Sequence, residues 1–155
     1  MIVTRPAQAS DAEGMSALIT PILVKWGSKR PRDPEHMRAN YIQNPDNIRC
    51  TVAEDETGRI VGFQSLILPT SRNPYGTPDG WGEIGTYVAL DAGRGGVGRL
   101  LFANSLAAAR DAGIKKIEAS IGRDNPLGLA YYQAMGFRTH DLTDTLDRKC
   151  YVVSL

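Results

Sequence analysis

The chain alternates between segments in which apolar residues recur every three or four positions and short apolar runs typical of strands. Ser10 and Asp11 offer an N-cap for the first helix, and Pro21 predicts that this helix kinks or ends there. Pro34 can open a second, short helix. The apolar stripes of these two helices are Met15, Leu18, Ile19 and Ile22, and Met37, Tyr41 and Ile42.

The remaining segments complete a mixed pattern of strands and helices. We expect helices over about 99–112 and over 126–135, ended by Gly113 and Gly136. We expect strands over 2–5, 50–54, 60–68, 83–90, 114–121, 137–142 and 150–155. The order β-α-α-β-β-β-α-β-α-β-β predicts an α/β (α+β) fold, with residues 1–155 as one domain around a mixed sheet of six or seven strands and about four helices.

Composition and charge exclude several classes of protein. Eighteen Lys and Arg against seventeen Asp and Glu give a net charge of +1, so we expect no nucleic-acid partner. No apolar run approaches the ~18 residues of a membrane span, and the N-terminal stretch lacks a signal-peptide core, which favours a cytoplasmic location. Two distant cysteines, Cys50 and Cys150, and two histidines, His36 and His140, favour neither a disulfide framework nor a metal site.

A glycine-rich turn joins the 83–90 strand to the 99–112 helix. Its glycines allow backbone N–H groups to approach a ligand closely, and the helix start adds partial positive charge, which suits a pyrophosphate. Arg94 and Arg99 flank this turn and can meet further phosphate oxygens. The four glycines, which fall within six residues, are Gly93, Gly95, Gly96 and Gly98.

The same residues satisfy G-x-G-x-x-G, with Glu118 20 residues past Gly98, so a dinucleotide-binding fingerprint is an alternative. That fingerprint belongs directly after the first strand of a domain, whereas several elements precede this turn. Residues 89–92 also separate the apolar run from the first glycine, and only 37 residues follow Glu118. We therefore favour a phosphate loop of another kind, and we expect Glu118 on an exposed strand face.

A second motif lies in residues 125–137, where a loop asparagine, a helix tyrosine and a Gly-Phe exit follow one another. Its residues are Asn125, Gly128, Tyr132, Gly136 and Phe137. The two motifs, their order and the strand layout resemble the GCN5-related N-acetyltransferases, the GNAT superfamily, over nearly the whole chain. The segment WGEIGTYVALD looks most like the phosphinothricin acetyltransferase branch, which acts on amino acids and similar amines.

The glycine turn is similar to the pyrophosphate motif of this family, [Q/R]-x-x-G-x-[G/A]. Gly96 and Gly98 fall on its small positions, while Gly93 stands where Arg or Gln is usual. The resemblance implies acetyl-CoA as cofactor, with its pantetheine arm paired to the 83–90 strand and a main-chain N–H near Tyr87 or Val88 as oxyanion donor. The cofactor-binding residues that it implies are Tyr87, Val88, Arg94, Gly95, Gly96, Val97, Gly98, Arg99, Asn125 and Tyr132.

The implied activity is acyl-CoA-dependent N-acyl transfer (EC 2.3.1 type). The acetyl group passes from acetyl-CoA to the primary amine of a small molecule, an amino acid or a similar compound, by direct attack in a ternary complex. A non-catalytic acyl-CoA sensor on the same fold is the alternative from another class. Homodimers are common in the family, and segment 150–155 could pair across subunits.

Acyl transfer to an amine needs a base for the ammonium and a group that protonates or stabilises the departing thiolate. Glu83 is the candidate base, because the family often keeps a glutamate at the start of this strand; Glu54 and Asp79 are lesser candidates. Tyr132 is the candidate acid, since the pKa of a phenol, about 10, is close to the pKa of a thiol.

The acceptor side is expected to involve the 27–34 loop and the long Pro- and Gly-rich loop over 69–82. Aromatic and arginine side chains in such segments can hold a small molecule that bears a carboxylate. The candidates are Trp26, Tyr75 and Trp81, with Arg30 and Arg32 beside them. We expect His36 and His140 at the surface rather than in catalysis.

Overall fold

The computed structural model describes residues 1–70, 72–93 and 95–154, so that Arg94 of the glycine loop lies outside the described residues. The elements follow one another as β1 (Val3–Pro6), η1 (Ala9–Asp11), α1 (Ala12–Lys25), α2 (Pro34–Met37), η2 (Arg38–Ile42), β2 (Asn47–Glu54), β3 (Ile60–Ile67), β4 (Gly82–Val88), α3 (Val97–Asp111), β5 (Lys116–Gly122), α4 (Pro126–Met135), β6 (Arg138–Leu142) and β7 (Leu146–Val152).

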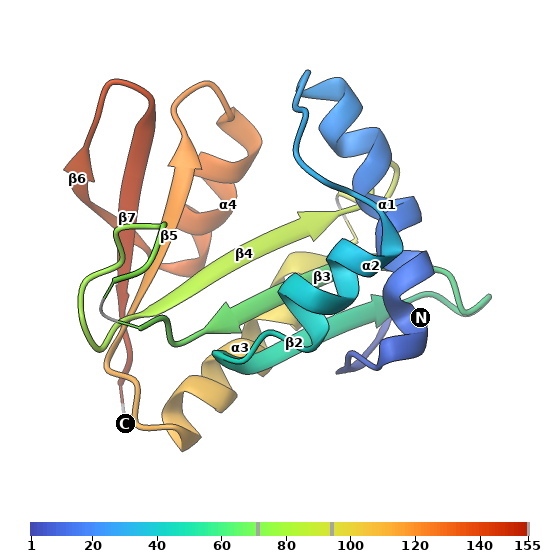
Figure 1. Ribbon diagram of the computed structural model, residues 1–155, viewed down its shortest axis with the longest axis horizontal. Helices are drawn as coiled ribbons and strands as arrows, with labels where there is room; N and C mark the ends of the chain where they lie inside the picture. Colours follow the sequence, from blue (N-terminus) through green and yellow to red (C-terminus); the bar gives the residue numbers. More distant parts are fainter. Residues whose placement is uncertain (71, 94, 155) are drawn as a thin grey trace.

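The strands form one mixed sheet of seven in the order β1-β2-β3-β4-β5-β7-β6. Neighbours pair antiparallel except at the centre, where β4 and β5 run parallel. Helices α1 and α2 cover one face, and α3 and α4 cover the other (Figure 1). The predicted mixed sheet and helix order are confirmed.

Apolar side chains gather in two clusters along the sheet. One holds α1 and α2 against the β2–β4 part, with Met15, Phe63 and Met37 completely buried. The other holds α3 and α4 against β4, β5 and the end of the chain, with Ile117 and Phe137 completely buried. The burial of apolar surface stabilises this arrangement by about 25 cal/mol per Å².

Helix α1 does not end at Pro21 but continues to Lys25, so that part of the prediction is wrong. A proline inside a helix removes one backbone hydrogen bond. Ile22 and Leu23 follow it and are 4% and 0% exposed, so their burial offsets that loss.

The last strand starts at Leu146, earlier than its predicted start at Cys150. It is an interior strand, because β5 pairs with one side and β6 with the other. Strand β6 pairs only with residues 147–150, so pairing of the 150–155 segment across subunits stays a prediction.

Candidate active site

The centre of the sheet opens between β4 and β5. The register joins Gly82 to Ile117 and Glu83 to Glu118, and the described residues show no further pair between these strands. Successive N–H groups of a strand point to opposite sides, and the Ala89 N–H donates to Val61 of β3 at 2.9 Å. The N–H of Val88 therefore points into the opening, so this edge of β4 is free to pair with an extended ligand.

Beyond this edge, the glycine loop leads into the N-terminus of α3. Gly96 is the N-cap, with φ at +76°, a left-handed conformation that favours glycine. Within the described part of the loop no side chain caps the helix, so its first N–H groups are left for a ligand. A Cβ at Gly93 or Gly96 would meet nothing within 4 Å. An open rim of N–H groups at a helix start suits a pyrophosphate.

The two side chains that follow Gly96 and Gly98 play different parts in this loop. Val97 is 2% exposed and packs in the core, so only its main chain can face a ligand. Arg99 lies on the exposed side of the first turn and can turn toward a phosphate.

A tertiary contact explains why position 98 is occupied by a glycine. A Cβ there would lie 2.5 Å from the Tyr131 ring, and the Tyr131 hydroxyl donates to the Gly98 carbonyl oxygen at 2.7 Å. The same hydroxyl accepts from Gln64 Nε2 at 3.0 Å. Tyr131 thus ties α4 to the phosphate loop. We did not predict this role, since the sequence shows only two adjacent tyrosines.

Tyr132 reaches β4 from the α4 side of the sheet. Its hydroxyl lies 2.8 Å from Thr86 Oγ1, which also accepts from Gln64 Nε2 at 2.8 Å. Burial raises the pKa of Tyr132 well above its usual range, so the phenol keeps its proton. Its hydroxyl is therefore a hydrogen-bond donor beside the opening.

Asn125 begins α4. Its Oδ1 accepts from the Gly128 N–H at 3.0 Å, and a Cβ at Gly128 would lie 2.6 Å from Asn125 Nδ2. The motif spacing therefore has a local reason, the N-cap of α4. A contact of Asn125 with the pantetheine arm stays a prediction.

Glu83 lies on the other face of β4, under the long loop. Thr77 Oγ1 of that loop donates to Glu83 Oε2 at 2.9 Å. Burial is the main reason that the pKa of Glu83 rises to about 8; the hydrogen bond from Thr77 opposes the rise and the neighbouring charge of Glu118 adds to it. Glu83 is thus a carboxyl whose proton affinity approaches that of an amine.

Glu118 is completely buried, so the expectation of an exposed strand face is wrong. Its Oε1 accepts from Arg148 Nη2 at 2.5 Å, and its Oε2 lies 2.6 Å from His140 Nε2. The His140 side chain is 28% exposed, yet it is bound to this carboxylate rather than free at the surface. Only the sheet order, which places β7 next to β5 and β6 next to β7, brings these groups together.

Arg30, from the segment after α1, lies over the same face near the other end of β4. Its Nη2 donates to the Tyr87 hydroxyl at 2.8 Å and lies 3.4 Å from the Tyr41 hydroxyl. Trp26 contributes a ring 6.3 Å from the ring of Tyr87 and is 48% exposed. Among the described residues no carboxylate pairs with Arg30. Arg32 instead donates to the Ser28 carbonyl oxygen at 2.6 Å.

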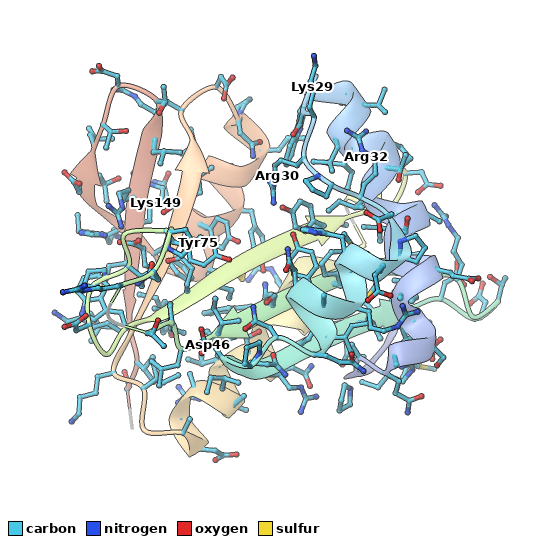
Figure 2. All side chains as sticks on the ribbon, in the orientation of Figure 1. Lys29, Arg30, Arg32, Asp46, Tyr75 and Lys149 are labelled. Atoms are coloured by element: carbon cyan, nitrogen blue, oxygen red, sulfur yellow. The ribbon has the colours of Figure 1, made fainter. Side chains whose placement is uncertain are left out.

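Tyr75 and Trp81 belong to the long loop and lie toward β5, β6 and β7. Tyr75 is 51% exposed, and Figure 2 shows it and Arg30 on the viewed face. The Trp81 ring lies 5.1 Å from the His140 ring. The Trp26 ring, beside Tyr87, and the Trp81 ring, beside Gly82, thus lie near opposite ends of β4.

The lesser base candidates lie elsewhere. Glu54 accepts from Arg5 at 3.2 Å near the start of β3, whereas Glu83 pairs with the last residue of β3. Asp79 is exposed in the loop. Neither carboxylate adjoins the opening between β4 and β5.

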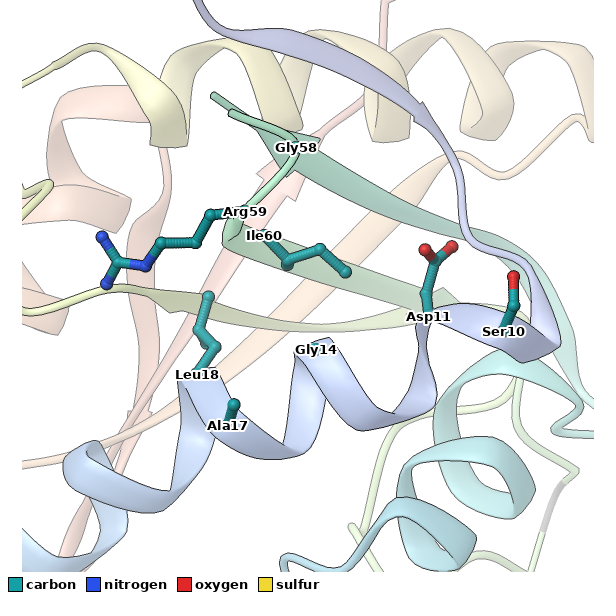
Figure 3. A pocket seen from close by; sticks show the side chains of 8 residues that line it. All are labelled: Ser10, Asp11, Gly14, Ala17, Leu18, Gly58, Arg59 and Ile60. Carbon is teal, nitrogen blue, oxygen red and sulfur yellow. The ribbon is translucent and has the colours of Figure 1, made fainter. Parts of the chain in front are cut away.

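A hollow of about 310 Å³ lies between α1 and the turn before β3 (Figure 3). Its acidic group, Asp11, is held by Arg5 through two contacts of 2.8 Å. Gly14 and Leu18 line its α1 side. Its two charged side chains are paired, Asp11 with Arg5 and Arg59 with Asp91, so we assign the chemistry to the opening beside β4.

Within residues 1–70, 72–93 and 95–154, no cluster of three His, Cys, Asp or Glu side chains could hold a metal ion. None of the helices in the same ranges combines the length and apolar character needed to cross a bilayer.

Solved structures of similar fold include three acetyltransferases. A phosphinothricin acetyltransferase of the GNAT superfamily from Sinorhizobium meliloti, in complex with AcCoA, is 18% identical with a TM-score of 0.81, covering 99% of this chain and 89% of that one. A GCN5-related N-acetyltransferase from Kribbella flavida is 21% identical with a TM-score of 0.79, covering 97% of each chain. A ribosomal-protein-alanine N-acetyltransferase from Brucella melitensis is 23% identical with a TM-score of 0.77, covering 97% of this chain and 99% of that one.

These likenesses concern the fold. No curated protein matches the chain significantly in sequence. The sequence model of the acetyltransferase (GNAT) family matches residues 16–137, which span the glycine loop, the opening beside β4 and the α4 motif. The dinucleotide-binding alternative is therefore wrong. The chain belongs to the acetyltransferase (GNAT) family, as an acyl-CoA-dependent acetyltransferase with acetyl-CoA as its cosubstrate.

Proposed function

We propose that this acetyltransferase acetylates the primary amine of a small, amino-acid-like molecule by direct attack in a ternary complex. The observation that carries the proposal is Glu83, a carboxyl of raised pKa on β4 beside the opening. A carboxylate of ordinary pKa is a poor acceptor for an ammonium proton, whereas one near 8 is better matched to it.

In this mechanism each side of β4 has its own task. Acetyl-CoA supplies an activated thioester carbonyl when bound. Glu83 takes a proton from the acceptor ammonium, directly or through a water, which leaves the amine free to attack. The Val88 N–H, which points into the opening, can donate to the oxygen that becomes negative. The Tyr132 hydroxyl donates to the departing sulfur, and its buried position keeps it protonated until then.

Two features of the acceptor side support a small substrate. The long loop is tied down over the sheet, by Thr77 on Glu83 and by the Gly76 carbonyl oxygen on Arg148 Nη2 at 2.7 Å. A covered face suits a small molecule better than the surface of a folded protein. Arg30, whose described contacts are phenols and not carboxylates, can bind an acidic group of the acceptor.

The test is CoA release from acetyl-CoA with a panel of amines, in which each amino acid is paired with its decarboxylated amine and peptides with free N-termini are included. We expect the amino acids to be acetylated faster than their amines and faster than the peptides. Preference for peptides would overturn the small-molecule acceptor, and the absence of transfer to any primary amine would overturn N-acetylation.

Calorimetric titration measures the cosubstrate separately. We expect acetyl-CoA to bind with a Kd in the micromolar range and NADH not to bind. The glycine loop offers a helix start to a pyrophosphate, but the fold around it is not a dinucleotide-binding fold. A homodimer also remains a prediction.

A further inference from the structure

Glu118 is a second carboxylate at the acceptor side that the mechanism above leaves without a task. It is the register partner of Glu83 at the place where β4 and β5 are still paired. Side chains of register partners on parallel strands lie on the same face, so these two carboxyl groups are neighbours. Since Glu118 is 0% exposed, its charge cannot be stabilised by water.

Two donors on neighbouring strands replace that water. Arg148 on β7 and His140 on β6 each bind one oxygen of Glu118, at 2.5 and 2.6 Å. Two adjacent buried carboxyl groups resist losing both protons. Arg148 and His140 bind the Glu118 carboxylate, and the charge of Glu118 raises the pKa of the neighbouring Glu83.

We propose that Glu118, held by Arg148 and His140, is a positioning residue that decides at which pH Glu83 becomes free to accept the proton of the acceptor amine. The proposal rests on the proposed function, in which Glu83 is the base. In that step one N–H bond of the ammonium breaks and one O–H bond forms on Glu83.

The groups that act on Glu83 come from every element around it. Thr77 of the long loop, Glu118 on β5 and Arg148 on β7 act on Glu83 directly, and Tyr132 on α4 interacts with it. On β6, His140 contacts Glu118 and Asp141 acts on Arg148. Arg148 favours ionisation of Glu83 and Glu118 disfavours it, so the two have opposite effects. Substitution of Glu118 and substitution of Arg148 should therefore shift the titration midpoint of Glu83 in opposite directions.

Glu118→Gln is the first variant, because the amide keeps an oxygen for Arg148 and removes the charge. The titration of Glu83 is followed by NMR of carbon-13-labelled glutamate carboxyl groups without substrate, and its signal is identified by its absence in Glu83→Gln. We expect the midpoint to fall by about one pH unit or more. Arg148→Gln should move the midpoint upward. Glu54→Gln, which also removes a strand carboxylate paired with an arginine, should leave it unchanged.

The pH dependence of kcat/KM gives the second readout. Wild-type activity should rise with pH through a midpoint near 8, because Glu83 must lose its proton to act. Glu118→Gln should shift this rise to lower pH by the same amount as the NMR midpoint, which a merely structural role of Glu118 would not do.

An unchanged Glu83 midpoint in folded Glu118→Gln, or a downward shift in Arg148→Gln, would overturn the proposal. If Glu118→Gln does not fold, the direction of the shift in Arg148→Gln decides. If the wild-type protein acetylates no amine, the NMR titration still decides how the pair behaves, and only the proposed function fails.

Discussion

The two ends of β4 differ in the chemical groups that surround them. At the Val88 end, the strand leads into a glycine loop and a helix start, and most of the groups proposed to bind the cofactor are main-chain N–H groups. At the Glu83 end, the groups are side chains from the long loop, β5, β6 and β7. The cofactor end is thus a short continuous stretch of backbone, and the acceptor end is an assembly of distant residues.

This difference has a physical consequence. Backbone N–H groups do not titrate, so the loop presents the same donors to a phosphate at every working pH. Buried carboxyl groups titrate with their surroundings, so the acceptor end depends on each neighbouring charge. Changes at the loop should therefore act on cofactor affinity, and changes at the carboxyl groups should act on rate and its pH dependence.

The largest effect is expected for Glu83→Gln, which removes the base and keeps the shape. We predict that kcat falls by about 10²- to 10³-fold, while the Kd for acetyl-CoA stays within twofold. Steady-state kinetics and calorimetry measure the two quantities. Glu54→Gln should retain wild-type kcat. Nearly full activity of Glu83→Gln would remove the chemical task from this end of β4.

The corresponding change at the cofactor end is Gly98→Ala. The new methyl group would overlap the Tyr131 ring and displace α4 from the loop, so we predict about tenfold weaker binding of acetyl-CoA. Gly93→Ala is the matched control, since its Cβ would meet nothing within 4 Å. Adding Tyr131→Ala to Gly98→Ala should restore part of the affinity. Equal losses in the two single variants would show that the Tyr131 contact is irrelevant.

Arg30→Gln tests whether the acceptor is anionic. A lost charged hydrogen bond is worth about 1.5–3 kcal/mol, so KM for a carboxylate-bearing acceptor should rise at least tenfold, with kcat changed less. KM for the decarboxylated amine should not change. Lys29→Gln removes a neighbouring exposed cation and should have no such effect (Figure 2). An equal rise of KM for both acceptors would contradict a carboxylate contact.

The smallest effect concerns stability. The pKa of Glu83 is 4.5 in the unfolded chain and about 8 in the folded protein. Between these two pH values the folded state therefore holds a proton that the unfolded state has released. Stability contributed by this group is therefore present below about pH 4.5 and is lost as the pH rises to about 8. We predict that Glu83→Gln raises Tm by several degrees at alkaline pH and has little effect at acidic pH. Calorimetry across the pH range checks the sign, and a Tm difference independent of pH would contradict it.

Several features were predictable because they depend on neighbours in the chain. The glycine loop, the α4 cap at Asn125 and the order of strands and helices all follow from local backbone preferences and apolar spacing. The place where α1 ends was not predictable, because the burial of Ile22 and Leu23 against the sheet outweighs the local effect of Pro21.

The amino-acid sequence alone determined the element order and the glycine loop, since these are properties of short segments. The resemblance to a known family singled out Glu83 and Tyr132 as candidates. Only the tertiary structure decided that Glu118 is buried beside Glu83, that Tyr131 meets Gly98, and which donors surround the two carboxyl groups. Such contacts join residues that lie far apart in the chain. They form because sheet order and helix packing minimise exposed apolar surface over the whole molecule, and no short segment carries that information.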